Sequence, residues 1–196
     1  MKTLTLFFLL ITSFSWSCED LELLVSEEAI AQKIHEAAIQ LNQEYGEEEL
    51  TVVMVMKGAV CAVADLIRKL DMPVTLQYIK ASSYGSNGTT AGTLAIKGIE
   101  DLNLANRHVL IVDDIFDSGK TMTALVAKLQ ELQPKTLRTL VVLAKDVARE
   151  TKYLPDYVLF TIKNRFVVGY GLDYKEHYRN LPGIYAFIND TPPALP

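Results

Sequence analysis

The sequence predicts an α/β protein with a mostly parallel sheet, because short apolar stretches of strand character alternate with segments of helical periodicity. The clearest such unit is residues 109–122, VLIVDDIFDSGKTM, where four apolar residues precede an acidic, glycine-bearing turn. From Met122 onward apolar residues recur at helical spacing, so the turn lies between the carboxyl end of a buried strand and the beginning of a helix. Open α/β sheets bind their ligands at this position.

The other segments follow as further strand and helix units in chain order. Ser26 is a helix cap followed by acidic residues, and Ile30, Ile34 and Leu41 lie on one apolar face of the helix that it begins. Pro134 ends the helix that follows the central turn. A helix is predicted over residues 60–70, and strands are predicted over residues 51–56, 74–81, 93–97, 137–144 and 157–162.

Length and composition predict one domain with an ample core. The chain has 196 residues, 49% of them hydrophobic, which is the size and composition of a single globular domain. Its net charge of −5 argues against a nucleic-acid binder, which usually presents a basic surface. The two cysteines, Cys18 and Cys61, cannot form a disulfide framework, and the apolar neighbours of Cys61 favour a buried, reduced thiol.

The central turn has the composition of a phosphate site. Gly119 lets the backbone approach an anion, and Ser118 and Thr121 supply hydroxyl groups beside the free N–H groups of a helix terminus. A nucleotide triphosphatase loop also ends in Gly-Lys-Thr, as residues 119–121 do here. That loop requires glycine five residues before Gly119, where this chain has Asp114, so the triphosphatase interpretation is rejected.

Three carboxylates share this turn, at Asp113, Asp114 and Asp117. They would repel a phosphate unless they face hydroxyl groups, a metal ion or a proton. A ligand that carries both a phosphate and a sugar diol matches both features of the turn: the phosphate faces the N–H and hydroxyl groups, and the diol faces the carboxylates.

The same turn resembles the phosphoribosyl-pyrophosphate signature of type I phosphoribosyltransferases. Three further segments narrow the resemblance to the hypoxanthine-guanine phosphoribosyltransferases: MKGA at 56–59, SSYG at 82–85 and RFVVGYGLDY at 165–174. The similarity extends from about residue 23 to about residue 188. It implies the type I phosphoribosyltransferase fold over residues 19–190, in which a small hood of N- and C-terminal segments covers the site on a mostly parallel sheet flanked by helices.

The resemblance implies a purine salvage enzyme. Such an enzyme transfers the 5-phosphoribosyl group from phosphoribosyl pyrophosphate to N9 of hypoxanthine or guanine, and gives IMP or GMP and pyrophosphate. Mg²⁺ is the implied cofactor. No nucleic-acid partner is expected. The protein is expected to form a homo-oligomer, either a dimer or a tetramer.

The resemblance also assigns roles to individual residues. Asp117 is the proton acceptor at N7 of the purine, and Asp173 is the Mg²⁺ ligand. The ribose and its 5-phosphate are contacted by Asp113, Asp114, Ser118, Gly119, Lys120 and Thr121. Pyrophosphate is contacted by Lys57, Gly58, Ser83, Tyr84 and Arg179, with an unusual cis peptide in the Lys57-Gly58 turn. The purine is contacted by Lys145, Phe166 and the backbone of Val167.

Plainer interpretations exist for several of these residues. Lys57 and Lys145 are equally consistent with solvated lysines at strand ends, and Phe166 with a core aromatic. Residues 82–92 can be a long hairpin connection, or a lid that closes over the site and excludes water. The resemblance favours the functional interpretation in each case.

Two positions depart from the commonest pattern of the family. Asp113 stands where many relatives have glutamate, and Ser118 stands where many have threonine. Asp173 and Arg179 are six residues apart and can be neighbouring surface charges. A diphosphate substrate nevertheless needs a cation held by oxygen ligands and a guanidinium group for its leaving group.

The two ends of the chain lie outside the resemblance. Residues 1–18 have the layout of a secretory signal peptide, with Lys2, a short apolar run and small residues, but the run is too short to span a bilayer. Because a phosphorylated sugar diphosphate is a cytosolic metabolite, a cytoplasmic protein that in effect begins near Glu19 is favoured, with no stable membrane association. Residues 191–196 are expected to be a flexible tail.

Two functions of other classes are weighed against the enzyme. A regulator that senses phosphoribosyl pyrophosphate would keep residues 109–122 but would have no need of Lys145, Phe166 and Asp173 together. It would usually show a basic nucleic-acid surface, which the charge balance does not support. An exported binding protein is supported only by residues 1–18.

Overall fold

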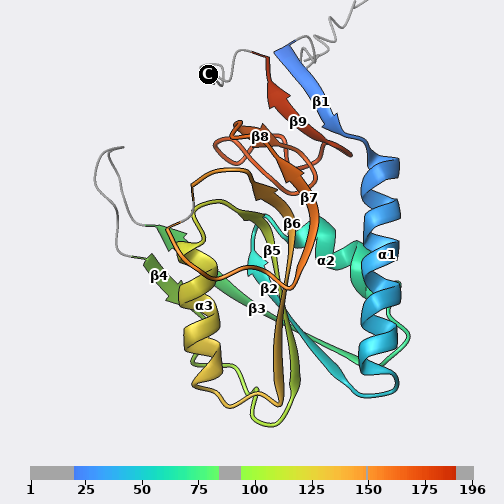
Figure 1. Ribbon diagram of the computed structural model, residues 1–196, viewed down its shortest axis with the longest axis vertical. Helices are drawn as coiled ribbons and strands as arrows, with labels where there is room; N and C mark the ends of the chain where they lie inside the picture. The colour runs from blue at the N-terminus through green and yellow to red at the C-terminus, as the bar shows by residue number, and fades with distance from the viewer. Residues whose placement is uncertain (1–19, 84–93, 149, 189–196) are drawn as a thin grey trace, which may run out of the picture.

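A six-stranded sheet forms the centre of the computed structural model, which describes residues 20–83, 94–148 and 150–188 (Figure 1). Across the sheet the strands are β4 (Leu94–Lys97), β3 (Val74–Ser83), β2 (Leu50–Met56), β5 (His108–Phe116), β6 (Thr136–Lys145) and β7 (Tyr157–Ile162). Only β4 runs antiparallel to its neighbour, β3. The predicted α/β class with a mostly parallel sheet is confirmed.

Helices cover both faces of this sheet. On one face α1 (Glu27–Tyr45) and α2 (Val60–Ile67) pack against alternate strand residues such as Val52 and Leu110. On the other, α3 (Lys120–Gln130) packs against the intervening residues, such as Val53 and Ile111. Because successive side chains of a strand point to opposite faces, a strand buried on both faces has to be apolar throughout. None of the helices in the described ranges is long and apolar enough to cross a membrane.

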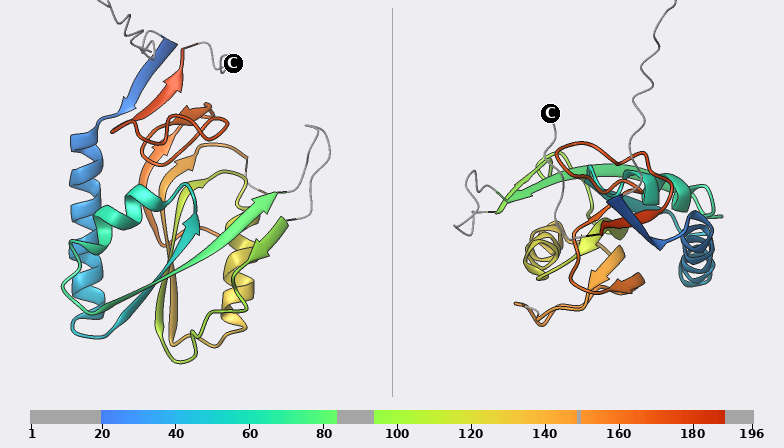
Figure 2. Two further views of the ribbon diagram at one scale, coloured as in Figure 1. Left: turned by 180° about the vertical axis from the view of Figure 1, so that it is seen from behind. Right: turned by 90° about the horizontal axis from the view of Figure 1, so that it is seen from above.

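A second, three-stranded antiparallel sheet forms the hood. Its order is β1 (Leu21–Val25), β9 (Ile184–Phe187) and β8 (Val167–Val168), so it joins the N-terminal and C-terminal segments of the described chain. Figures 1 and 2 show it beyond the carboxyl ends of the parallel strands. The hood implied by the family resemblance is therefore present.

The observed boundaries differ from the predicted ones in two places that matter. Strand β5 does not end with its four apolar residues but continues through Asp113 and Asp114 to Phe116. Asp113 is in register with Val141 of β6, so the backbone ladder continues where the side chains become acidic. The helix predicted over residues 60–70 ends at Ile67.

Candidate active site

The strand order creates a crevice between β2 and β5. These two strands are parallel neighbours, but the strand that follows β2 in the chain, β3, lies on its other side. Connections from such a pair leave in opposite directions and open a space at the carboxyl ends of the strands. The turn that contains Lys57 and Gly58 follows β2, and the turn at residues 117–119 follows β5.

A cavity of about 360 Å³ lies at this crevice and brings together residues from four separate segments. Seven residues assigned to substrate or metal line it: Lys57, Gly58, Asp113, Asp114, Thr121, Asp173 and Arg179. Lys80 and Glu176 line it as well, although neither was among the predicted site residues. Residues far apart in the chain thus form one polar site, as a single-site interpretation requires.

Two adjacent carboxylates line the cavity, Asp113 buried and Asp114 half-buried. Asp113 is only 7% exposed, and its Oδ1 accepts a hydrogen bond of 3.0 Å from the backbone N–H of Asp114. Burial raises the pKa of Asp113 well above its usual range, and the neighbouring charge of Asp114 raises it further. Burial also raises the pKa of Asp114, while the positive charge of Arg179 acts in the opposite direction. The pair is therefore poised to receive hydroxyl donors or a cation.

This pKa shift predicts a pH-dependent effect of Asp113→Asn on stability. The folded protein holds the Asp113 proton more tightly than the unfolded chain, so the free energy of unfolding falls as pH rises above about 3.9. The asparagine keeps the acceptor oxygen and removes the charge. We expect it to raise the free energy of unfolding at pH 8 by about 1 kcal/mol or more, and by less at pH 5.

Urea denaturation at the two pH values measures this gain. The exposed carboxylate of Asp101 provides the control, as Asp101→Asn should change stability little at either pH. An equal gain from Asp113→Asn at both pH values would show that its buried charge does not destabilise the fold.

Close packing connects the turn after β2 to Asp114. A Cβ atom built on Gly58 would lie 1.5 Å from Oδ2 of Asp114, so no side chain fits there unless the carboxylate moves. We expect Gly58→Ala to displace Asp114 and to weaken phosphoribosyl pyrophosphate binding by about 10²-fold. Isothermal titration calorimetry measures this. Gly46→Ala is the control for a strained backbone away from the cavity, because Gly46 ends α1 with φ +59° and a Cβ there meets nothing within 4 Å; equal affinities of the two variants would contradict the prediction.

The turn after β5 has the form of an anion-binding site. Gly119 precedes α3 with φ +85°, a left-handed conformation that favours glycine. A Cβ there would lie 2.2 Å from Cγ2 of Thr151, so the segment after β6 packs closely on the turn. Nζ of Lys120 forms an ion pair of 2.5 Å with Oε2 of Glu150. Backbone N–H groups at the beginning of a helix bind phosphate readily.

Positive charges also line the cavity. Nη2 of Arg179 contacts Oδ1 of Asp173 at 2.8 Å and Oε2 of Glu176 at 3.1 Å, and its Nη1 donates to the carbonyl oxygen of Gly171 at 2.7 Å. Lys57 donates to the same Oε2 of Glu176 at 2.9 Å. Lys57, Asp173 and Arg179 are therefore not scattered surface charges but one network, with Glu176 at its centre.

Lys145 and Asp117 form a pair, and neither residue lines the cavity. Nζ of Lys145, the last residue of β6, donates to Oδ2 of Asp117 at 3.1 Å. The lysine side chain is 14% exposed and the carboxylate 54%, so Lys145 is not the solvated strand-end lysine that its position alone allowed. Phe166 directly precedes β8, packs edge-on against Tyr174 at 5.7 Å between ring centroids, and is 39% exposed.

Some expected residues are not brought into the cavity. Ser118, Gly119, Lys120, Phe166 and Val167 do not line it. Tyr84 lies outside the described residues, as do residues 1–18 and 191–196, and for Ser83 only the backbone at the end of β3 is described. The cis peptide is found at Met56-Lys57, one bond earlier than the expected Lys57-Gly58.

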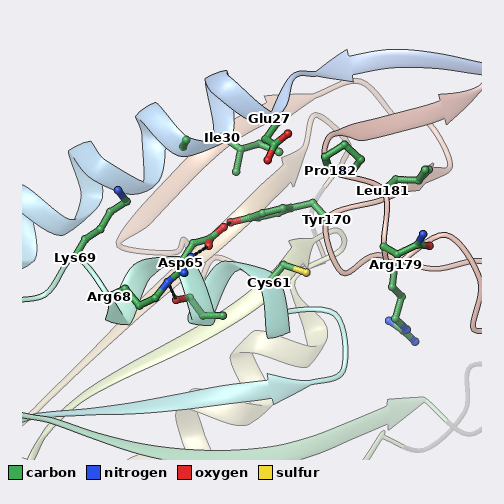
Figure 3. A pocket seen from close by; sticks show the side chains of 13 residues that line it. Glu27, Ile30, Cys61, Asp65, Arg68, Lys69, Tyr170, Arg179, Leu181 and Pro182 are labelled. Carbon is green, nitrogen blue, oxygen red and sulfur yellow. Dashed lines mark hydrogen bonds and ion pairs between the residues drawn. The ribbon is translucent and has the colours of Figure 1, made fainter.

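A second cavity, of about 460 Å³, shares Arg179 with the first and lies between α1, α2 and the loop around Leu181 (Figure 3). Tyr170 points from the hood toward α2 and donates to Oδ2 of Asp65 at 2.8 Å. Cys61 lines this cavity and is half-buried instead of fully buried. Burial raises the pKa of its thiol and the charge of Asp65 raises it further, so the thiol is not activated as a nucleophile.

Comparison with known proteins decides the family. Residues 21–175 match the phosphoribosyl transferase domain. A hypoxanthine-guanine phosphoribosyltransferase of Aquifex aeolicus is 39% identical over 166 residues, which cover 84% of this chain and 93% of the relative. The chain belongs to the hypoxanthine-guanine phosphoribosyltransferase family.

Other members of the hypoxanthine-guanine phosphoribosyltransferase family extend the similarity. A hypoxanthine-guanine-xanthine phosphoribosyltransferase of Tritrichomonas foetus is 37% identical over 168 residues, covering 85% of this chain and 91% of that protein. The crystal structure of a hypoxanthine-guanine phosphoribosyltransferase from Bacillus anthracis superposes with a TM-score of 0.79 at 38% identity, over 85% of this chain and 98% of that one. The type I phosphoribosyltransferase fold is thereby confirmed.

Proposed function

We propose that this chain transfers the 5-phosphoribosyl group from phosphoribosyl pyrophosphate to N9 of hypoxanthine or guanine. The observation that carries the proposal is the cavity at the β2–β5 crevice, where an acidic pair, a helix terminus and a group of cations meet. A phosphorylated sugar with a diol and a diphosphate has the complementary groups. The products are IMP or GMP and pyrophosphate.

The substrate is held at three places. The turn of Ser118, Gly119, Lys120 and Thr121 binds the 5-phosphate through N–H and hydroxyl groups. Asp113 and Asp114 accept hydrogen bonds from the ribose hydroxyls, and a diol in this position relieves the unfavourable burial of their charges. Lys57, Gly58 and Arg179 bind the pyrophosphate, to which Ser83 and Tyr84 are proposed to add contacts.

The donor set of the cavity fits Mg²⁺. This ion is usually bound by one or two carboxylates together with substrate phosphates, and the carboxylates that line the cavity include Asp173, Asp113 and Asp114. Oδ1 of Asp173 is held by Arg179 and its Oδ2 accepts from the N–H of Glu176 at 2.8 Å, so its carboxylate is oriented in advance. When bound, Mg²⁺ supplies positive charge that neutralises the leaving pyrophosphate.

Asp117 and Lys145 act on the purine. Lys145 donates to the oxygen at position six of the base, Phe166 stacks on the ring, and the backbone of Val167 reads the edge of the base. Asp117 accepts the proton from N7 as N9 forms its bond to the anomeric carbon and the carbon–pyrophosphate bond breaks. Lys57 and Arg179 stabilise the charge that develops on the leaving group.

The proposal extends to the setting in which the protein acts. It works in the cytoplasm, where its phosphorylated substrate is found, and it assembles as a homo-oligomer. Mass analysis of the N-terminus of the native protein tests the first point, and light scattering from purified protein tests the second.

Assays of nucleotide formation test the proposed reaction. Purified protein is given phosphoribosyl pyrophosphate and hypoxanthine, guanine or xanthine, each with and without Mg²⁺. IMP or GMP should appear only with Mg²⁺ and in equal amount to pyrophosphate. Binding of phosphoribosyl pyrophosphate without any nucleotide formation would instead support a sensing regulator.

A further inference from the structure

Glu176 joins the two cations to which pyrophosphate is assigned. Its Oε2 accepts from Nζ of Lys57 at 2.9 Å and from Nη2 of Arg179 at 3.1 Å. Lys57 and Glu176 are 119 residues apart in the chain, so the contact depends on the folded site. The Glu176 carboxylate thus lies between the two positive charges.

The backbone that presents Glu176 is unusual. Tyr174 and His177 exchange two backbone hydrogen bonds, of 3.2 and 3.0 Å, and close a tight hairpin turn. Its two central residues, Lys175 and Glu176, have φ of +48° and +69°. Such turns favour asparagine and glycine, because other side chains are strained in the left-handed region. Strain of this kind is retained where the side chain has a use.

Arg179 does not depend on Glu176 alone for its placement. Arg179 is also held by Asp173 at 2.8 Å and by the carbonyl oxygen of Gly171 at 2.7 Å. The Glu176 side chain is 64% exposed and projects into the cavity from its rim, so it can move away without any repacking of the core. Glu176 therefore contacts the cations, but the part of the cavity that holds Arg179 does not require it.

We propose that Glu176 occupies the place of pyrophosphate in the empty site and is displaced when a diphosphate binds. The proposal deepens the proposed function and rests on it. Two consequences follow from the competition between the carboxylate and the ligand. Lys57 and Arg179 remain neutralised while the site is empty, and the returning carboxylate assists release of the pyrophosphate product. Glu176 thus competes with the leaving group and limits the affinity for it.

Glu176→Gln tests the proposal through the affinity for pyrophosphate. Isothermal titration calorimetry of the full chain with pyrophosphate in the absence of metal gives the dissociation constant directly. We expect the glutamine variant to bind about 3- to 10-fold more tightly, because two partly exposed ion pairs no longer have to be broken. Pyrophosphate should also become a stronger product inhibitor of the variant by a similar factor. Glu176→Ala, which cannot accept a hydrogen bond, should change both quantities in the same direction.

Glu48→Gln is a matched control. Glu48 also contacts two basic side chains, His108 at 2.8 Å and Lys135 at 2.5 Å, but it precedes β2, whose site lies at the opposite end. A general effect of removing a surface glutamate would appear in both variants. Tighter pyrophosphate binding in the Glu176 variants alone supports the proposal.

The other outcomes overturn it in distinguishable ways. Unchanged affinity with a lowered melting temperature would make Glu176 a structural residue. Weaker binding that appears only when Mg²⁺ is added would make it a metal ligand. In both cases wild-type protein still binds pyrophosphate, so the proposed function stands. Wild-type protein that binds no pyrophosphate, with or without Mg²⁺, would overturn the proposed function and this inference together.

Discussion

Asp117→Asn should lower the turnover of nucleotide formation by about 10²- to 10⁴-fold, the range typical of a lost general base. The asparagine retains an oxygen that can accept from Lys145, whose Nζ lies 3.1 Å from Oδ2 of Asp117. It has almost no basicity, so the proton at N7 of the purine loses its acceptor. An aspartate is a weak base near neutral pH, which means that its contribution depends on its placement beside the bound purine.

Two measurements separate this role from a general defect of the site. Steady-state kinetics gives the loss of turnover, and calorimetry gives the affinity for phosphoribosyl pyrophosphate, which should stay within about threefold of wild type. Asp146→Asn, at the exposed carboxylate next to Lys145, is the control and should retain full turnover. Undiminished turnover of Asp117→Asn would remove Asp117 from the mechanism.

Arg179→Ala should produce the largest loss of affinity for ligands that carry a diphosphate. The guanidinium is 23% exposed and contacts Asp173 and Glu176, so its removal takes away a partly buried positive charge and leaves Asp173 without its ion-pair partner. We expect pyrophosphate and phosphoribosyl pyrophosphate to bind about 30- to 300-fold more weakly, as is common when one charged partner of an anion is truncated. Binding of the free purine should change little.

Arg138→Ala provides the matched control for this variant. Arg138 also contacts two carboxylates, Glu44 and Asp156, both at 3.1 Å, but neither these residues nor Arg138 line the cavity. Its removal should affect stability and leave ligand affinities unchanged. Equal weakening of purine and pyrophosphate by Arg179→Ala would contradict the assignment of Arg179 to the leaving group.

The local chemistry of the central turn is the part of the site that sequence predicts best. Strand, acidic turn and helix are consecutive, so Asp114, Asp117 and Thr121 can be placed relative to one another from spacing alone. The extension of β5 through the acidic pair could not be anticipated in this way. It follows from pairing of Asp113 with Val141 on the neighbouring strand, which overrides the preference of aspartate for turns.

Contacts between distant segments are the part that sequence predicts least. Strand β1 has no alternating pattern, and its partner β9 lies at the other end of the described chain. Glu176 looks like one charge among several in the stretch GLDYKEHYR, and only the fold brings it to Lys57. The family resemblance supplied the hood and the role of Arg179, whereas the residue that joins the two cations emerged from the geometry alone.

A crystal structure of the protein with phosphoribosyl pyrophosphate and Mg²⁺ is the most direct test of the single-site account. We expect one molecule in the cavity at the β2–β5 crevice, with its 5-phosphate on residues 118–121 and its ribose hydroxyls on Asp113 and Asp114. The pyrophosphate should contact Lys57 and Arg179. A molecule seated instead in the cavity beside Cys61 and Tyr170, or a 5-phosphate away from residues 118–121, would contradict the account.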